Sequence, residues 1–230
     1  MGAGVTGRRW AIGAAAFGLS FSGVLVGGAA QAHPHIFIDT GVETIFDAQG
    51  RVTALRIAWT YDDFYSLVSM EGRGLDADFD GVLTQEEAAE LVGFDMNWDA
   101  DYDGDLYVLW QGKAMAMGRP EAPTATYADG RITSTHLRKL AQPITMGAEG
   151  VTIQVYDSGY YTAYTINATA TLTNAPAGCT AQVFEPNLDE ADRKLQAILQ
   201  EFMADDNIEM QFPAVGANYA DEVRITCLAR

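Results

Sequence analysis

Apolar and polar residues alternate along most of the chain beyond residue 35, as they do in strands that bury one face. Residues 35–46 and 51–61 flank the turn Asp47–Gly50 and predict a hairpin, and residues 125–128 and 131–135 flank Asp129-Gly130, a two-residue hairpin signal. Further strands are expected at 151–157, 160–166, 168–173, 180–184 and 223–228. The pattern predicts a mainly β protein, an antiparallel β-sandwich.

Two segments have helical spacing instead. Residues 62–94 carry an acidic loop, with Phe64, Leu67 and Val68 before it and Ala88, Leu91 and Val92 after it. Residues 188–204 predict one C-terminal amphipathic helix, whose apolar face holds Leu195, Ile198, Leu199 and Phe202. We therefore expect a sandwich with a helical insert at about 62–94.

The first 32 residues are typical of a secretory signal peptide. Arg8 and Arg9 precede a small and apolar run that ends at Ala30-Gln31-Ala32, a small-residue cleavage site. An uncleaved membrane anchor is the alternative, and the export route, general or twin-arginine, stays open. Cleavage after Ala32 would leave residues 33–230 as a single periplasmic domain. No later stretch is apolar over about 18 residues, so we expect no membrane insertion of the mature chain.

The net charge limits the kinds of partner that this protein can bind, and the cysteine content predicts a disulfide. The formal net charge is −17, which argues against nucleic acid as a partner and suits cations. The chain has two cysteines, Cys179 and Cys227, and in an exported protein such a pair predicts a disulfide.

The segment DADFDGVLTQEE at residues 76–87 matches a complete EF-hand calcium loop. Calcium requires six to eight oxygen ligands, and the pattern places a ligand at each required position while Gly81 permits the sharp turn. The predicted ligands are Asp76, Asp78, Asp80, the carbonyl of Val82, Thr84 and a bidentate Glu87. Phe79 and Ala88 depart from the usual pattern, and a solvated acidic turn is the alternative. We expect bound Ca²⁺ with a structural role.

A second acidic run, DADYDGDLYVLW at residues 99–110, repeats part of this spacing. Its carboxylates are Asp99, Asp101, Asp103 and Asp105, but position 12 is Trp110 and a strand follows where a helix is needed. It is interpreted either as a weak cation loop or as a plain acidic turn.

The predicted mature chain begins with two histidines one residue apart. Because alternate residues of a strand share a face, His33, His35 and Asp39 would project together, and cleavage would add the α-amine of His33. Imidazole, amine and carboxylate ligands suit Zn²⁺, Ni²⁺, Co²⁺ or Cu²⁺, among which the sequence does not choose. An exposed strand start is the alternative. The third histidine, His136, is interpreted as a surface or packing residue before it is considered as a ligand.

Several motifs in order resemble a bacterial family of unknown function, labelled the periplasmic component of an uncharacterised ABC-type transport system. They are HPHIFID, WTYDDFYS, DADFDGVLTQEE, VYDSGYYTAY and APAGC, and together they span the predicted mature chain. The resemblance implies a membrane permease of the nickel/cobalt-efflux type as partner, or a role in zinc acquisition. It also directs attention to Asp62, Asp63 and Asp157 as further candidate ligands of the histidine site.

Three functions remain open. The leading hypothesis is a periplasmic accessory that binds Zn, Ni or Co for a transport system and carries a structural calcium ion. The alternative is a calcium-stabilised domain for protein contact, in which the histidines have no metal role. A copper-dependent oxidative enzyme that uses His136 as a further ligand is a remote third. No Ser/His/Asp order, catalytic cysteine or phosphate-binding glycine loop is present, so we do not expect an enzyme.

Overall fold

The computed structural model describes residues 34–147, 149–167, 170–200 and 213–227. The predicted signal segment, His33 and Phe202 lie outside these residues. The predictions that depend on them, the cleavage after Ala32 and the N-terminal amine chelate, are therefore untested.

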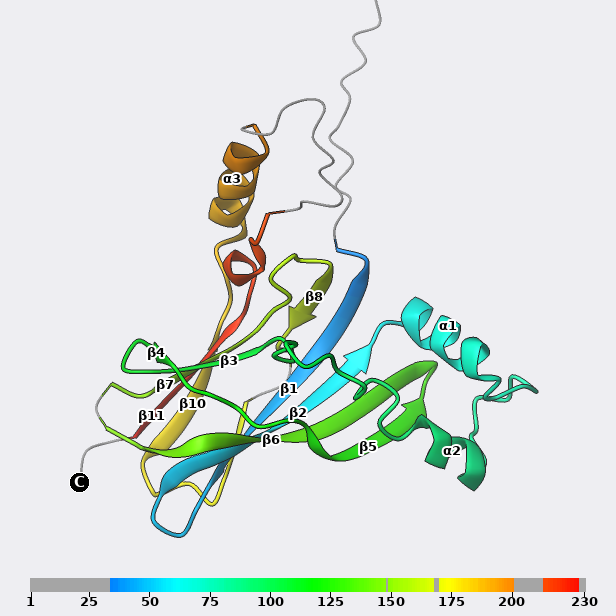
Figure 1. The fold of residues 1–230 in the computed structure, drawn as a ribbon, viewed down its shortest axis with the longest axis horizontal. Helices are drawn as coiled ribbons and strands as arrows, with labels where there is room; N and C mark the ends of the chain where they lie inside the picture. The colour runs from blue at the N-terminus through cyan, green and yellow to red at the C-terminus, as the bar shows by residue number, and fades with distance from the viewer. Residues whose placement is uncertain (1–33, 148, 168–169, 201–212, 228–230) are drawn as a thin grey trace, which may run out of the picture. The chain divides into compact units, whose positions relative to one another are not determined.

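The first sheet has the strand order β5-β6-β2-β1-β8, with β9 also paired to β1 (Figure 1). The strands are β1 (Ile36–Phe46), β2 (Arg51–Tyr61), β5 (Glu121–Ala128), β6 (Arg131–Thr145), β8 (Thr162–Thr165) and β9 (Thr171–Thr173). The predicted hairpins β1–β2 and β5–β6 are confirmed, and both are antiparallel. Buried and half-exposed residues alternate along β1 and β2, as the sequence predicts.

The second sheet has the order β10-β11-β7-β3-β4. Its strands are β3 (Leu106–Trp110), β4 (Lys113–Ala114), β7 (Val151–Val155), β10 (Cys179–Phe184) and β11 (Glu222–Cys227). Cys179 lies opposite Cys227 in the β10–β11 register, and the predicted disulfide between them is confirmed. All pairings of this sheet are antiparallel.

The expectation of purely antiparallel strands is wrong at one place. Strands β8 and β9 both run parallel to β1, with Ile36 opposite Thr162 and Glu43 opposite Thr171. The reason is connectivity: β7 belongs to the second sheet, so the chain crosses to the first sheet before β8 begins. Only strands joined by a tight turn must run antiparallel to each other. No such turn joins β8 to β1, so β8 can pair with β1 in the parallel direction.

One cluster of buried apolar side chains takes members from both sheets. Val42 and Ile57 come from the first sheet, whereas Val108, Ile153 and Ile225 come from the second, and all are at most 3% exposed. Burial of this apolar surface is the main favourable term for folding.

The helices are α1 (Asp63–Arg73), α2 (Gln85–Leu91) and α3 (Leu188–Leu199), with a short 3-10 helix, η1 (Gly216–Asn218). The predicted helix α3 buries Leu195 and packs Ile198 and Leu199 beside it, as expected. Its neighbours in this small cluster include Val215 and Tyr219. Among the described residues, no helix is both long and apolar enough to cross a membrane.

Helix α1 confirms the helical spacing predicted before the acidic loop, but its apolar residues are not buried. Phe64 is 74% exposed, and Leu67 and Val68 are about half exposed. The buried residues are instead Ser66, Ser69 and Met70. Ser66 is buried because its hydroxyl accepts a hydrogen bond from the backbone N–H of Ile132 in β6, which would otherwise lack a partner.

Candidate functional site

The acidic loop connects two short helices whose ends are fixed by local hydrogen bonds. Asp62 caps the start of α1 by accepting from the N–H of Tyr65, and Gly74 ends the helix with a φ of 68°. Helix α2 begins with a capping box, in which Thr84 and Glu87 each accept from the backbone N–H of the other. The loop is therefore held at both ends.

Asp76, Asp78 and Asp80 converge within this loop. One carboxylate oxygen from each lies within 4.8 Å of the others. Asp76 is 7% exposed, and its Oδ1 accepts from the N–H of Gly81 at 3.1 Å. The Oδ1 of Asp80 accepts from the N–H of Val82 at 2.8 Å. These bonds hold the carboxylates of Asp76 and Asp80 in the positions in which they converge with Asp78.

Glu87 closes the loop without belonging to that convergent set. Its Oε1 accepts from the N–H of Asp76 at 3.0 Å, and its Oε2 accepts from the N–H and hydroxyl of Thr84, both at 2.8 Å. These hydrogen bonds, chiefly those from Thr84, lower the pKa of Glu87. Glu87 thus ties the first loop position to the ninth, so the predicted ligands Asp76 and Thr84 lie beside one carboxylate.

The loop is chemically suited to a hard cation. Within the part of the chain that the structure describes, none of its three convergent aspartates forms an ion pair with a basic residue. Like charges held this close repel each other unless a cation lies between them. Carboxylate oxygens on a flexible loop are the ligands that Ca²⁺ prefers.

The second acidic run is arranged differently. Of the carboxylates in described positions, only the Asp76 set brings three candidate ligand atoms within 4.8 Å, and Asp99, Asp101 and Asp103 form no such group. Two arginines bind the backbone of the run instead. Arg119 donates to the carbonyl of Asp99 at 2.8 Å, and Arg138 donates to that of Asp103 at 2.8 Å.

Asp105, the last carboxylate of this run, is buried in the core. Its Oδ2 accepts from the hydroxyls of Tyr102 and Tyr164 at 2.8 and 2.7 Å. Burial raises the pKa of Asp105 to about 6, although the two tyrosine hydrogen bonds act against this. A Cβ atom at the preceding Gly104 would lie 2.3 Å from Arg138, so the glycine is needed for packing. These contacts give the glycine and the last aspartate structural roles.

His35 lies in a shallow depression together with two predicted partners. Asp62 and Asp63 line it, along with Phe37, Phe64 and Arg131. Both Asp62 oxygens already accept backbone hydrogen bonds, from Phe37 at 2.9 Å and from Tyr65 at 2.8 Å. Asp63 is the more available carboxylate, because its contact with Arg131 is 3.7 Å long and it is highly exposed.

Asp39, in strand β1, pairs with a cation. Its Oδ2 lies 2.8 Å from Arg131, and its Oδ1 accepts from the side-chain amide of Asn167. Arg131 also donates to the carbonyls of Thr60 and Tyr61, so it is fixed in place.

Asp157 acts in the turn that contacts His35. It accepts from the backbone N–H groups of Gly159, Tyr161 and Thr162 at 2.9–3.1 Å. The carbonyl of Tyr161 then accepts from the N–H of His35 at 2.8 Å, and the two rings lie 4.7 Å apart. Asp157 therefore supports the backbone next to His35.

His136 lies in the core and is fully buried. Its ring contacts Trp59 at 4.7 Å and Trp98 at 5.4 Å between centroids, and neither nitrogen has a hydrogen-bond partner among the described residues. Burial, and to a lesser degree the charge of Arg138, lower the pKa of His136 to about 4. The neutral ring is thus a packing residue between two tryptophans.

The hydrophobic pattern of the sequence did not indicate two polar residues of this core, the half-buried Asp95 and the buried Arg138. Asp95 accepts from the hydroxyls of Tyr61 and Ser134, and Arg138 lies over the ring of Trp98 at 4.9 Å. Ser134, His136 and Arg138 are all buried on alternate positions of β6. Extending the strand predicted at 131–135 would have placed all three on its inner face.

Comparison with known proteins identifies a family without assigning a function. No curated protein matches the chain. The family model described as "Protein of unknown function (DUF1007)" matches residues 19–227. This confirms the membership of an uncharacterised family that the motifs indicated. The chain belongs to the DUF1007 family.

Proposed function

We propose that this protein is an exported calcium-binding accessory protein, in which an EF-hand-like insert stabilises a β-sandwich. The observation that carries the proposal is the convergence of Asp76, Asp78 and Asp80 within 4.8 Å. The helices on both sides of the loop and the bond from Gly81 to Asp76 also support it.

The ion would be structural. Leu75 and Leu91, which flank the loop, are at most 4% exposed and belong to the main core cluster. Joining three carboxylates through one cation would therefore fix a segment that is anchored in the core at both ends. Any ion that binds only the folded state stabilises it by mass action.

Calcium should raise the thermal stability of the mature protein. At a free concentration about 100 times the Kd, the expected gain is about 2.7 kcal/mol. The double variant Asp76→Asn/Asp80→Asn should abolish this gain, because each substitution removes a charged ligand. The measurement is thermal unfolding with Ca²⁺ and with chelator, together with native mass spectrometry.

Asp99→Asn combined with Asp101→Asn is the matched control, since it removes equal charge from the second acidic run. Full calcium stabilisation should remain in this control. Equal stabilisation of wild type and the Asp76/Asp80 variant would exclude the proposed loop as the site.

The second proposed activity is binding of Zn, Ni or Co at the N-terminal histidines, for transfer to or from a membrane permease. What supports it is the depression lined by His35, Asp62 and Asp63, which joins residues from two segments. In addition, the motif resemblance relates the protein to metal-transport systems. One imidazole and one exposed carboxylate are suitable ligands, with His33 as the further candidate.

His35→Ala should weaken transition-metal binding by at least about tenfold, because each imidazole is a principal ligand. Isothermal titration of the mature protein with Zn²⁺, Ni²⁺ and Co²⁺ measures this. His136→Leu serves as the control and should leave the affinity unchanged, since that ring is in the core.

Unchanged affinity in His35→Ala would favour protein contact as the function instead. The exposed face of α1 formed by Phe64, Leu67 and Val68 supports that alternative, because clustered exposed apolar residues are typical of contact surfaces.

A further inference from the structure

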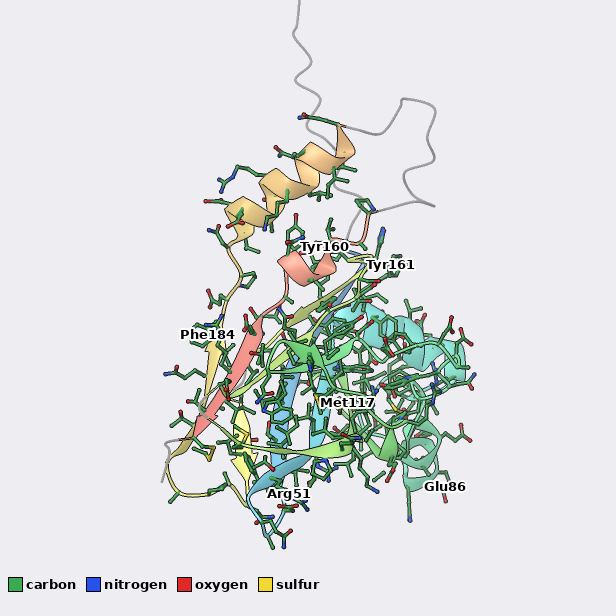
Figure 2. The ribbon with its side chains drawn as sticks, turned by 60° about the vertical axis from the view of Figure 1, so that its left-hand side comes forward. Arg51, Glu86, Met117, Tyr160, Tyr161 and Phe184 are labelled. Atoms are coloured by element: carbon green, nitrogen blue, oxygen red, sulfur yellow. A yellow bond between two sulfur atoms is a disulfide. The ribbon has the colours of Figure 1, made fainter. Side chains whose placement is uncertain are left out.

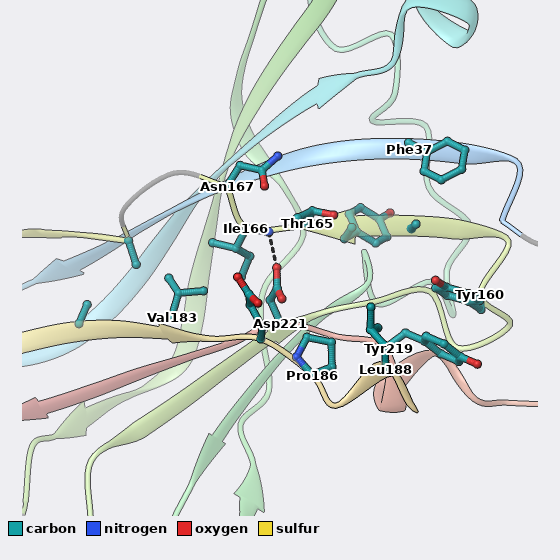
Figure 3. A pocket seen from close by; sticks show the side chains of 15 residues that line it. Phe37, Tyr160, Thr165, Ile166, Asn167, Val183, Pro186, Leu188, Tyr219 and Asp221 are labelled. Atoms are coloured by element: carbon teal, nitrogen blue, oxygen red, sulfur yellow. Dashed lines mark hydrogen bonds between the residues drawn. The ribbon is translucent and has the colours of Figure 1, made fainter. Parts of the chain in front are cut away.

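A cavity of about 650 Å³ lies between the edge strands of the two sheets (Figure 3). Its walls include Ala163, Tyr164 and Thr165 of β8 on one side and Ala181 and Val183 of β10 on the other. Segments from α3 and from the end of η1 complete it. This volume falls within the range of sites for small organic molecules, about 300–1,000 Å³.

One carboxylate is buried in the wall of this cavity. Asp221 is 6% exposed, and its Oδ2 accepts from the backbone N–H of Ile166 at 2.6 Å. Figure 3 shows this bond and the Asp221 side chain among the other lining residues. The bond fixes the orientation of the carboxylate but supplies no positive charge.

The described part of the lining is negative and contains no basic side chain. Glu185 also lines the cavity, and the described lining residues include no Lys, Arg or His. Neither Asp221 nor Glu185 forms an ion pair within the described chain. Burial and then the nearby charge of Glu185 raise the pKa of Asp221. A buried carboxylate without a cation is costly, and a bound cation would remove that cost.

Aromatic rings form the rest of the recognition surface. Tyr160 and Tyr219 stack with centroids 4.2 Å apart, and both line the cavity with Phe37. Figure 2 shows Tyr160 beside Tyr161 and away from Glu86 of α2. The faces of such rings attract ammonium and guanidinium groups, and their edges pack against apolar carbon.

We propose that this cavity binds a small organic cation, an amine or amidine carried on an apolar body. The charged group would pair with Asp221 and Glu185, and the body would pack against the tyrosines, Phe37 and Val183. A bare metal ion fits less well, because these two carboxylates are not part of any cluster of three candidate ligands among the described residues. The inference goes beyond the proposed function and uses none of the calcium ligands.

Phenethylamine and its uncharged analogue 2-phenylethanol provide the direct test. They share a ring and a two-carbon chain and differ in the charged group. We expect saturable binding of the amine and at least about tenfold weaker binding of the alcohol, because only the amine can form charged hydrogen bonds with the buried carboxylate. Titration calorimetry of the mature protein and NMR shifts of the lining residues give the affinity and the location.

Two variants and two controls assign the effect to the cavity. Glu185→Gln should weaken amine binding about threefold, as expected for an exposed charge, and Asp221→Asn should weaken it about tenfold or more. Glu86→Gln removes an equal charge from α2 and should leave the affinity unchanged. Asp78→Asn should also leave it unchanged, which separates this proposal from the calcium proposal.

Circular dichroism of each variant shows whether it is folded. If Asp221→Asn does not fold, Glu185→Gln still tests the proposal, because the Glu185 side chain forms no hydrogen bond with any residue that the structure describes. Equal affinity for phenethylamine and 2-phenylethanol would overturn the proposal. So would the absence of amine binding, or binding of basic peptides without binding of the small amine.

Discussion

Replacing Cys179 and Cys227 together by alanine should lower the free energy of unfolding by about 4 kcal/mol. The disulfide closes a loop with a sequence separation of 48 residues, and in the chain-entropy model such a cross-link restricts the unfolded chain by about this amount. The two residues are also opposite each other in the β10–β11 register, so the bond fixes an edge strand to its neighbour. Urea unfolding of the wild type and the variant measures the difference.

The wild type in excess reductant is the control for this prediction. Its unfolding midpoint should match that of the double alanine variant, since both lack only the cross-link. A loss below about 1 kcal/mol would show that the reduced unfolded chain is already compact around this loop.

Replacing Asp105 by asparagine should stabilise the protein by about 3 kcal/mol at pH 7 and have only a small effect at pH 4. The folded pKa of Asp105 is raised from 3.8 to about 6, so the folded state favours the protonated carboxyl. The stability from this group is complete below pH 3.8 and is lost as the pH rises through 6. About two pKa units correspond to about 3 kcal/mol.

Asparagine suits this position for two further reasons. Its carbonyl can still accept from Tyr102 and Tyr164, and its backbone tolerates the φ of 52° found at Asp105. Urea unfolding at pH 7, 5.5 and 4 measures the effect. Destabilisation at pH 7 would mean that the negative charge of Asp105 itself is needed in the folded state.

The titration of His136 also contributes to the pH dependence of stability, in both the wild type and this variant. Its folded pKa, about 4, is below the ordinary value of 6.5, so its contribution is present above pH 6.5 and is lost as the pH falls toward 4. In the wild type this loss opposes the gain from protonation of Asp105. Asp105→Asn removes only the gain, and its stability should therefore fall more steeply on acidification than that of the wild type.

The strands could be predicted from the sequence where the signal is local. The Asp129-Gly130 turn and the alternation on both sides of it determine the β5–β6 hairpin without help from the rest of the chain. The direction of β8 could not be predicted in this way. It depends on which sheet the chain enters after β7, and no local pattern contains that information.

Helix α1 shows that helical periodicity does not by itself tell which face of a helix is buried. Phe64, Leu67 and Val68 have the spacing of an apolar stripe, but the structure leaves them exposed. Ser66 is buried because a strand end needs its hydroxyl, a tertiary requirement that hydrophobicity does not encode.

The candidate calcium loop was predictable because all its ligands lie within twelve consecutive positions. The cavity was not. Its lining combines Phe37, the region around β8, strand β10 and Asp221, which are far apart in the sequence and are brought together only by the two sheets. Asp221 lies beside a strand in the sequence and carries no signal that would distinguish it from a turn residue.

The parallel pairing of β1 has a consequence for the order of folding. One edge of β1 can pair with β2 as soon as the first hairpin exists, but the other edge waits for β8 and β9, more than a hundred residues later in the chain. Contacts of such long range slow folding, because the chain loses the entropy of closing a large loop before the stabilising hydrogen bonds form. Until then the hairpin presents an open edge that could pair with another chain. We therefore expect aggregation to compete with folding chiefly before β8 and β9 have paired with β1.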